Sequence, residues 1–273
     1  VKGLVAMKRF IYLCTNAILL KDYLEQLPVT PYLTLSIHLD GMEEDHDRIV
    51  DQKGTFKLAI EAVQEAKKRG FRVTSATTFF EDTTVEKAEE FLDFLIPFGL
   101  DGITMASAFR YQDAPDQDHF FGRRRTFDFF DKLLAKNKKD RWDLNHSPLY
   151  LEFLRGKRDY SCTPWGNPSY SVLGWQKPCY LLDEGYAETF KELMETTEWE
   201  NYGHQNNRKC ADCTAHCGYE PTAVEDATSS LKGMFDSAKM VFQSLKFLVL
   251  MNYYTYGQLL LLPFSIFHNY LLD

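Results

Sequence analysis

The feature that most constrains the fold is an alternation of short apolar runs with helical patterns. The apolar runs are rich in β-branched and aromatic residues and occur at 9–15, 32–39, 71–80 and 100–107. Between them, residues 55–70 repeat apolar side chains at the spacing of one helix face and stop at Gly70. A second helical pattern over 83–99 opens with Thr83 and has Glu86 three positions later. This order predicts parallel βα units, and hence an α/β fold whose sheet is covered by helices.

The small number of strands suggests that the fold is incomplete. Four parallel strands alone would leave a sheet edge and part of a core uncovered. We therefore expect residues 1–144 to form the second half of a partial (β/α) barrel, with the N-terminal half missing from this chain. Residues 145–230 are aromatic and rich in Pro and Gly, and we expect them to form a small cysteine-rich C-terminal domain. Residues 231–273 form an apolar tail whose role the sequence leaves open.

The tail is long and apolar enough to raise the question of a membrane. Its last 30 residues have about the length of a membrane span, but Asn252, Gln258, Pro263 and His268 interrupt them. A packed helix or a sequence-end irregularity is therefore favoured, and peripheral contact with a membrane surface is the alternative.

Charge and cysteine content limit the partners and the compartment. A formal net charge of −8 argues against a nucleic-acid partner, because neutralising phosphates needs an excess of clustered Lys and Arg. The one basic run, 123–125, is expected to be a solvated loop or helix start. Six cysteines in 273 residues are too few for a disulfide scaffold, which favours a reducing, cytoplasmic setting.

Five of the six cysteines lie in the C-terminal region. Cys210, Cys213 and Cys217 have the spacing C-x2-C-x3-C, and Cys162 or Cys179 could add a further ligand. Thiolates at this spacing suit either one tetrahedral metal ion or several corners of an iron–sulfur cluster. The nearly all-cysteine supply favours iron, but zinc remains open, as do inert buried cysteines.

Polar side chains also finish the predicted strands. Cys14 and Asn16 follow the first run, and Ser36, His38 and Asp40 alternate onto one face of the second. Because functional groups of such barrels gather at the carboxyl ends of the strands, these residues predict a shared pocket, although each alone could be a cap or turn residue. Cys14 could be a nucleophile, a ligand, a hydrogen-atom donor or a small buried hydrophobe.

Several long strings of the sequence resemble one known family, the adenosyl-hopene transferases. These are radical S-adenosylmethionine (SAM) enzymes of hopanoid biosynthesis, and the similarity runs from about residue 8 to about residue 226. The strings that carry it are "RFIYLCTNAILL", "YLTLSIHLDGMEEDHD", "GFRVTSATTFF", "APDQDHFFGR", "NHSPLYLEFLRGKRDYSCTPWGNP", "GWQKPCYLLDEGYAETFKELME" and "KCADCTAHCGYEPTAV".

The resemblance implies both cofactors and a reaction. The fold would be a partial (β/α) barrel that binds SAM and a [4Fe-4S] cluster, followed by a cysteine-bearing domain. The reaction would add the 5′-deoxyadenosyl group of SAM to the alkene of diploptene, a triterpene hydrocarbon, and give adenosylhopane. Its partners would be this hopene lipid and a reducing electron donor, and the protein would orient the alkene and exclude water.

The resemblance also implies roles for individual residues. Cys14 looks like the family's pocket cysteine, whose thiol could donate hydrogen to the radical left after addition. Ser36, His38 and Asp40 fall where such barrels present polar groups to SAM, and Asn16 is a weaker candidate for the same pocket. The five C-terminal cysteines would hold an auxiliary iron–sulfur cluster or zinc.

The sequence departs from the family at one decisive place. The C-x3-C-x2-C loop that holds the radical cluster and the Gly-Gly-Glu motif belong before residue 1, so we expect this chain alone to be an inactive fragment of the enzyme. The C-x2-C-x3-C string has the inverse spacing and is not that loop. The alternative is a non-catalytic, metal-stabilised binding or scaffold protein.

Overall fold

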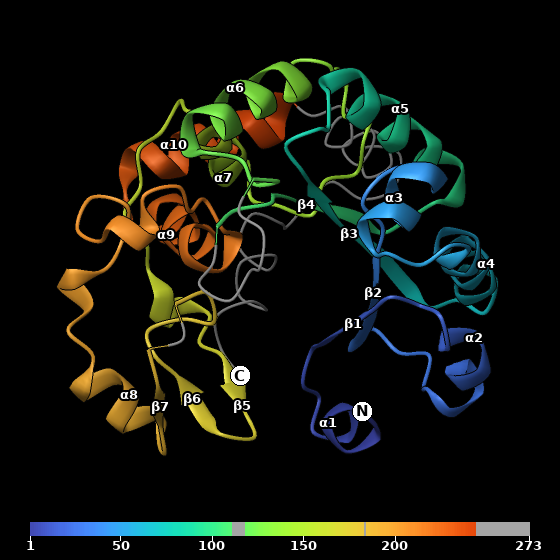
Figure 1. The fold of residues 1–273 in the computed structure, drawn as a ribbon, viewed down its shortest axis with the longest axis horizontal. Helices are drawn as coiled ribbons and strands as arrows, with labels where there is room; N and C mark the ends of the chain where they lie inside the picture. The colour runs from blue at the N-terminus through green and yellow to red at the C-terminus, as the bar shows by residue number, and fades with distance from the viewer. Residues whose placement is uncertain (111–117, 183, 244–273) are drawn as a thin grey trace, which may run out of the picture.

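The first half of the chain is built on a parallel sheet. The computed structural model describes residues 1–110, 118–182 and 184–243, with the side chains of 240–243 left aside. The sheet has the order β1-β2-β3-β4 with every pair parallel (Figure 1). Its strands are β1 (Ile11–Thr15), β2 (Leu33–His38), β3 (Arg72–Phe79) and β4 (Gly102–Ser107). The predicted α/β class with parallel strands is confirmed.

A further extended segment joins this sheet beyond β4. Leu144 forms a parallel bridge with Ile103, whose N–H donates to the Asp143 carbonyl at 2.6 Å and whose carbonyl accepts from the Asn145 N–H at 2.8 Å. Sequence analysis missed this segment because Leu144 stands alone between polar residues and shows no strand period. The bridge carries the sheet into the second half of the chain.

Helices cover one face of the sheet and leave the other open. The connections are α1 (Lys2–Ala6), α2 (Leu20–Tyr23), α3 (Glu43–Ile49), α4 (Thr55–Lys68) and α5 (Val85–Leu95), with 3-10 turns at Leu24–Gln26 and Ile96–Phe98. The side chains of Leu33, Leu35 and Ile37, at every second position of β2, are fully buried. Since successive strand residues point to opposite faces, this set faces the helices and the residues between them face the open side.

The predicted helices lie where the spacing placed them, with one correction. α4 buries its apolar stripe, as the 55–70 pattern predicts. For α5 the N-cap is Thr84 and not Thr83, because the Thr84 side chain accepts from the Lys87 N–H whereas the Thr83 hydroxyl accepts from the Phe80 N–H.

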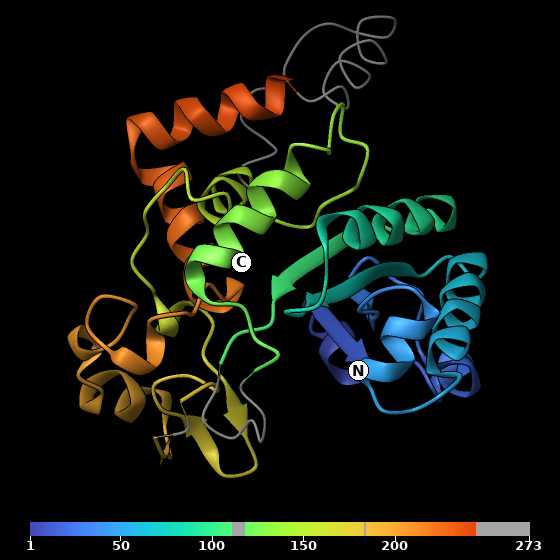
Figure 2. The same ribbon diagram turned by 45° about the horizontal axis from the view of Figure 1, so that its top comes forward.

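The second half combines helices with a small antiparallel sheet (Figure 2). Its helices are α6 (Arg123–Leu134), α7 (Pro148–Leu154), α8 (Phe190–Thr196), α9 (His216–Ser229) and α10 (Leu231–Gln243). Its strands are β5 (Tyr170–Ser171), β6 (Gly174–Gln176) and β7 (Tyr186–Ala187), with 3-10 turns at Pro164–Gly166, Trp199–Asn201 and Arg208–Cys210. One hydrophobic cluster includes both Leu35 of β2 and Tyr219 of α9. The boundary between residues 144 and 145 stays a prediction.

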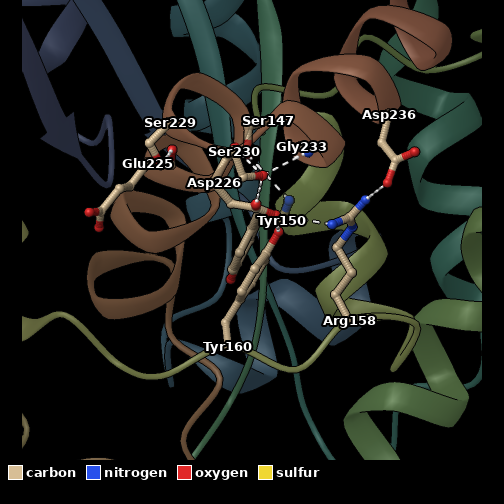
Figure 3. A network of polar contacts seen from close by, with 10 residues as sticks. All are labelled: Ser147, Tyr150, Arg158, Tyr160, Glu225, Asp226, Ser229, Ser230, Gly233 and Asp236. Atoms are coloured by element: carbon tan, nitrogen blue, oxygen red, sulfur yellow. Dashed lines mark hydrogen bonds and ion pairs between the residues drawn. The ribbon is translucent and has the colours of Figure 1, made fainter.

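Helix α10 is held against α9 by a polar network (Figure 3). The Arg158 guanidinium pairs with Asp226 of α9 at 3.0 Å and with Asp236 of α10. The Asp226 carboxylate also accepts from the Tyr160 hydroxyl at 2.7 Å and from the Ser230 hydroxyl at 2.6 Å. Residues 231–243 of the predicted apolar tail are thus a docked helix, while 244–273 lie outside the described residues. Among the described residues, no helix is both long and apolar enough to cross a membrane.

Candidate active site and cysteine cavity

One face of the sheet carries a row of short side chains across three strands, and on the fourth strand the row ends at Gly102, against which the Asn145 side chain packs. The register pairs Cys14 with Ser36, Ser36 with Thr74, and Thr74 with Gly102. Neighbouring strands lie about 4.8 Å apart, so these positions are adjacent on one face. Cys14 is exposed, Ser36 is buried, and the buried Thr74 hydroxyl has no hydrogen-bond partner within the described part of the chain. The row therefore offers one exposed thiol, with two buried hydroxyls beside it.

His38 and Asp40 form a pair at the carboxyl end of β2. The His38 Nε2 atom lies 2.6 Å from the Asp40 carboxylate, whose other oxygen accepts from the Thr78 N–H at 2.7 Å. Ser36 and His38 lie on β2 as predicted. Asp40 does not, because β2 ends at His38 and Asp40 lies in the loop beyond it. The carboxylate is buried while the imidazole is 39% exposed, so His38 can reach a ligand that Asp40 cannot touch.

Two histidines at this strand end have opposite electrostatic environments. The hydrogen bond with Asp40 raises the pKa of His38 above its ordinary 6.5. Burial lowers the pKa of His46, whose Nδ1 accepts from the Asp40 N–H at 3.2 Å. His46 therefore favours its neutral form and supports the loop, whereas His38 keeps its proton to a higher pH than a free imidazole does.

Asn16 has a local structural contact. It follows β1 directly and is exposed, and its side-chain oxygen accepts from the Ile18 N–H at 3.3 Å, as in a turn. Its amide group remains accessible on the end of β1 next to Cys14.

The five C-terminal cysteines come together from three separate segments. Cys162, Cys179, Cys210 and Cys213 line one cavity, and Cys217 lies within electrostatic range of Cys162 and Cys179. None forms a disulfide. Within the described part of the chain, no three Cys, His, Asp or Glu side chains converge closely enough to hold one metal ion. Four of the five thiols thus line one cavity, and they do not converge on a single metal position.

A glycine makes room for one of these thiols. A Cβ atom on Gly218 would lie 2.4 Å from the Cys162 Sγ atom, and the Gly218 carbonyl accepts from the Thr163 N–H at 2.7 Å. The first turn of α9 therefore packs directly on the segment that follows Cys162. Any side chain at position 218 would push this thiol out of place.

Burial favours the protonated form of these thiols. It raises the pKa of Cys162 and of Cys217 to about 12, and it raises the pKa of Cys213 well above its ordinary value. A metal or cluster needs thiolates, so binding here would release protons. The donor chemistry fits an iron–sulfur cluster or zinc, because cysteine sulfur is the ligand that both prefer.

Arg123 at the start of α6 brings a positive charge to this region. Its guanidinium donates to the Cys213 carbonyl at 2.7 Å and lies 5.0–5.3 Å from the ring centroids of Phe127, Phe153 and Tyr219. The 123–125 run does begin a helix as predicted, but the prediction of a solvated run was wrong for this half-buried side chain. A basic run in the sequence does not show which of its members turns inward.

A buried histidine and a glutamate join the sheet to α9. The His146 Nδ1 atom lies 2.9 Å from the Glu220 carboxylate, which also accepts from the Ser147 N–H at 2.5 Å. The His146 Nε2 atom accepts from the Met105 N–H of β4 at 2.9 Å. This pair was not predicted from the sequence, because its members are 74 positions apart and no local pattern links them. The only local signal was Ser147 followed by a proline, the start of α7.

Two family models match successive parts of the chain. Residues 2–95 match the family described as "Radical SAM superfamily", and residues 103–237 match "Domain of unknown function (DUF3463)". Residues 2–95 are thus similar to radical SAM superfamily domains, and the segment after them is similar to a domain to which no function is assigned. No curated protein matches the sequence.

Solved structures show the same fold. The chain is similar to "Native anSMEcpe with bound AdoMet" at 17% identity and a TM-score of 0.51, over 89% of this chain and 74% of that one. It is also similar to "Native anSMEcpe with bound AdoMet and Kp18Cys peptide" at 17% identity and a TM-score of 0.50, over 75% of this chain. In that comparison the chain spans 63% of the neighbour's length. At this identity the likeness concerns the fold.

Proposed function

We propose that this chain belongs to a radical SAM transferase of hopanoid biosynthesis that adds the 5′-deoxyadenosyl group of SAM to the alkene of diploptene. The superfamily match supports SAM chemistry with a [4Fe-4S] cluster, and a structural neighbour holds AdoMet. The specific substrate rests on the family strings of the sequence. The observation that carries the proposal is the exposed Cys14 thiol, placed beside Ser36 on the open face of a sheet of this fold.

The open face would bind SAM through its polar side chains. When bound, SAM would supply the 5′-deoxyadenosyl group as a radical, released together with methionine when one electron from the reducing donor breaks the C5′–S bond. Ser36 would offer its hydroxyl to the nucleoside, and Asn16 would offer its amide. His38, oriented by the buried Asp40 carboxylate, would donate to a ribose or carboxylate oxygen. These contacts would fix the position of the reacting carbon relative to the substrate.

Cys14 would complete the reaction on the substrate side. Addition to the alkene leaves an unpaired electron on a tertiary substrate carbon. The Cys14 thiol would donate its hydrogen atom to this carbon and become a thiyl radical. One electron and one proton, supplied by the external reducing donor and solvent, would return it to the thiol.

The cysteine cavity would hold an auxiliary iron–sulfur cluster. In a cluster each ligating thiolate binds a different iron, so at most four of the five cysteines can bind a [4Fe-4S] cluster, and four of them line the cavity. Arg123 would stabilise negative charge on the bound cluster. Zinc is the alternative, and its tetrahedral site would require the thiols to move closer together.

The origin of the added hydrogen tests the proposal. The protein, in a form that carries a C-x3-C-x2-C loop, is incubated anaerobically in deuterated water with SAM, a reductant and diploptene. Thiol hydrogens exchange with solvent, so we expect adenosylhopane that carries deuterium at the tertiary carbon. Cys14→Ala should abolish the reduced product, whereas Tyr12→Phe, a mild change at an exposed position of the same strand, is the matched control. Unchanged formation of reduced product by the Cys14 variant would contradict the role of this residue.

A further inference from the structure

The hairpin formed by β5 and β6 exposes its most apolar residues at its tip. Val172 is 101% exposed and Leu173 is 67% exposed, between the paired positions Ser171 and Gly174. Figures 1 and 2 both place this small sheet at the end of the C-terminal half opposite α10. The tip is thus a protrusion that packs on nothing within the described chain.

The composition of the hairpin suits an apolar medium. No Asp, Glu, Lys or Arg occurs between Asp159 and Lys177, so the whole hairpin is uncharged. At the tip, the Leu173 N–H donates to the Ser171 hydroxyl at 3.1 Å and is satisfied without water. Unpaired polar groups oppose transfer into lipid, so internal pairing of this amide lowers the cost of insertion.

Aromatic rings lie directly behind the tip. Tyr170 is 67% exposed and packs edge-on against Trp175 with 5.0 Å between ring centroids. Trp175 in turn contacts Phe190 at 5.2 Å. Tyr and Trp are enriched at membrane interfaces, where an apolar ring and a polar group meet different surroundings. The hairpin therefore has aliphatic side chains at its end and amphipathic rings at its base.

We propose that this hairpin tip inserts into the interfacial region of a lipid bilayer and docks the protein on a membrane. A second copy of the chain is a poorer occupant, because a two-residue tip buries far less than the roughly 800 Å² per partner of a stable interface. The net charge of −8 opposes attraction to anionic lipids, so binding is driven by apolar insertion and needs no anionic headgroup. This inference does not depend on the proposed reaction.

Vesicle flotation tests the docking. The full chain is mixed with phosphatidylcholine vesicles, and we expect a bound fraction that persists in 0.5 M salt. Val172→Asp combined with Leu173→Asp should lower the partition coefficient at least about tenfold, the loss expected on withdrawing branched aliphatic side chains from an apolar phase. Val29→Asp is the matched control, since Val29 is 55% exposed in the other half of the molecule. This control should bind as the unaltered protein does.

Three results would overturn the proposal. They are absence of binding by the unaltered protein, equal loss in the hairpin and control variants, and binding that appears only with anionic lipid and disappears in salt. A hairpin variant that changes the molecular mass in solution without changing flotation would assign the tip to self-association instead. If the hairpin variant fails to fold, quenching of tryptophan fluorescence by brominated phosphatidylcholine in the unaltered protein decides the question, because Trp175 lies behind the tip.

Discussion

The two halves of this molecule are stabilised in different ways. The parallel-sheet half repeats one device, an apolar face of each strand packed on an amphipathic helix, and its buried residues are mostly aliphatic. The cysteine-bearing half has two- and three-residue strands, short turns and individual contacts such as that of Gly218 with Cys162. A repeated pattern distributes stability over many residues, whereas single contacts concentrate it. Substitutions in the first half should therefore lower the stability of the fold as a whole, whereas substitutions in the second half should disturb the individual contact that they remove.

The largest effect on stability is expected from the sheet core. Leu35→Ala empties a fully buried position of β2 and should reduce the free energy of unfolding by about 3 kcal/mol. The bound metal per folded protein should not change. Chemical denaturation with metal analysis measures both, and Leu35→Ile is the matched control, expected to cost less than about 1.5 kcal/mol. Loss of metal from the folded Leu35→Ala protein would show that the halves are not separable.

At Gly218 we expect a smaller loss of stability together with a loss of bound metal. Gly218→Ala places a methyl group against the Cys162 thiol and should cost about 2 kcal/mol, less than the sheet substitution, but it should displace this proposed metal ligand. Metal content should fall while the circular dichroism of the sheet half is retained. The control is Gly3→Ala, because a Cβ there meets no atom within 4 Å and, as at Gly218, φ is not positive. Full metal content in the Gly218 variant would contradict the packing described.

The junction between the halves should respond to pH. Burial opposes ionisation of Glu220, but hydrogen bonds from His146 and Ser147 outweigh it and hold the pKa of the carboxyl below 4.5. A lowered pKa means that its stabilising effect is present above pH 4.5 and is lost as the pH falls through the folded value. Glu220→Gln should cost about 1–2 kcal/mol at pH 7 and flatten acid unfolding in this window. Unfolding curves of the two proteins from pH 7 to pH 3 that run parallel would refute this.

The smallest effect is expected where α10 docks. Asp236→Asn weakens the pair with Arg158, whose guanidinium keeps its contact with Asp226, so the cost should be about 1 kcal/mol or less. Hydrogen exchange of amides in α10 should become faster while that of β2 and β3 does not change. Faster exchange throughout the sheet would mean that α10 is part of the same cooperative unit.

The sequence predicts the parallel-sheet half better than the cysteine-bearing half. The period of the apolar residues identified all four strands of the parallel sheet and α4, because burial on a regular element leaves a regular trace. The cysteines were visible as a group, but their shared cavity depends on contacts between distant segments. His146, Glu220 and the inward side chain of Arg123 left no such trace, since a single polar contact across the fold has no period. The bridge at Leu144 was missed for the same reason.

The central claim is that the C-terminal cysteines bind a cluster to which Cys14 does not contribute. The iron and sulfide content of single-cysteine variants tests this claim most directly. The protein is reconstituted anaerobically with iron and sulfide, and the unaltered chain is compared with Cys162→Ser, Cys213→Ser and Cys14→Ser. We predict bound iron with acid-labile sulfide and a visible charge-transfer spectrum in the unaltered protein, strong loss in the first two variants, and no change in Cys14→Ser. Zinc without sulfide, or equal loss on changing Cys14, would contradict a cluster in the cysteine cavity that is separate from the open face of the sheet.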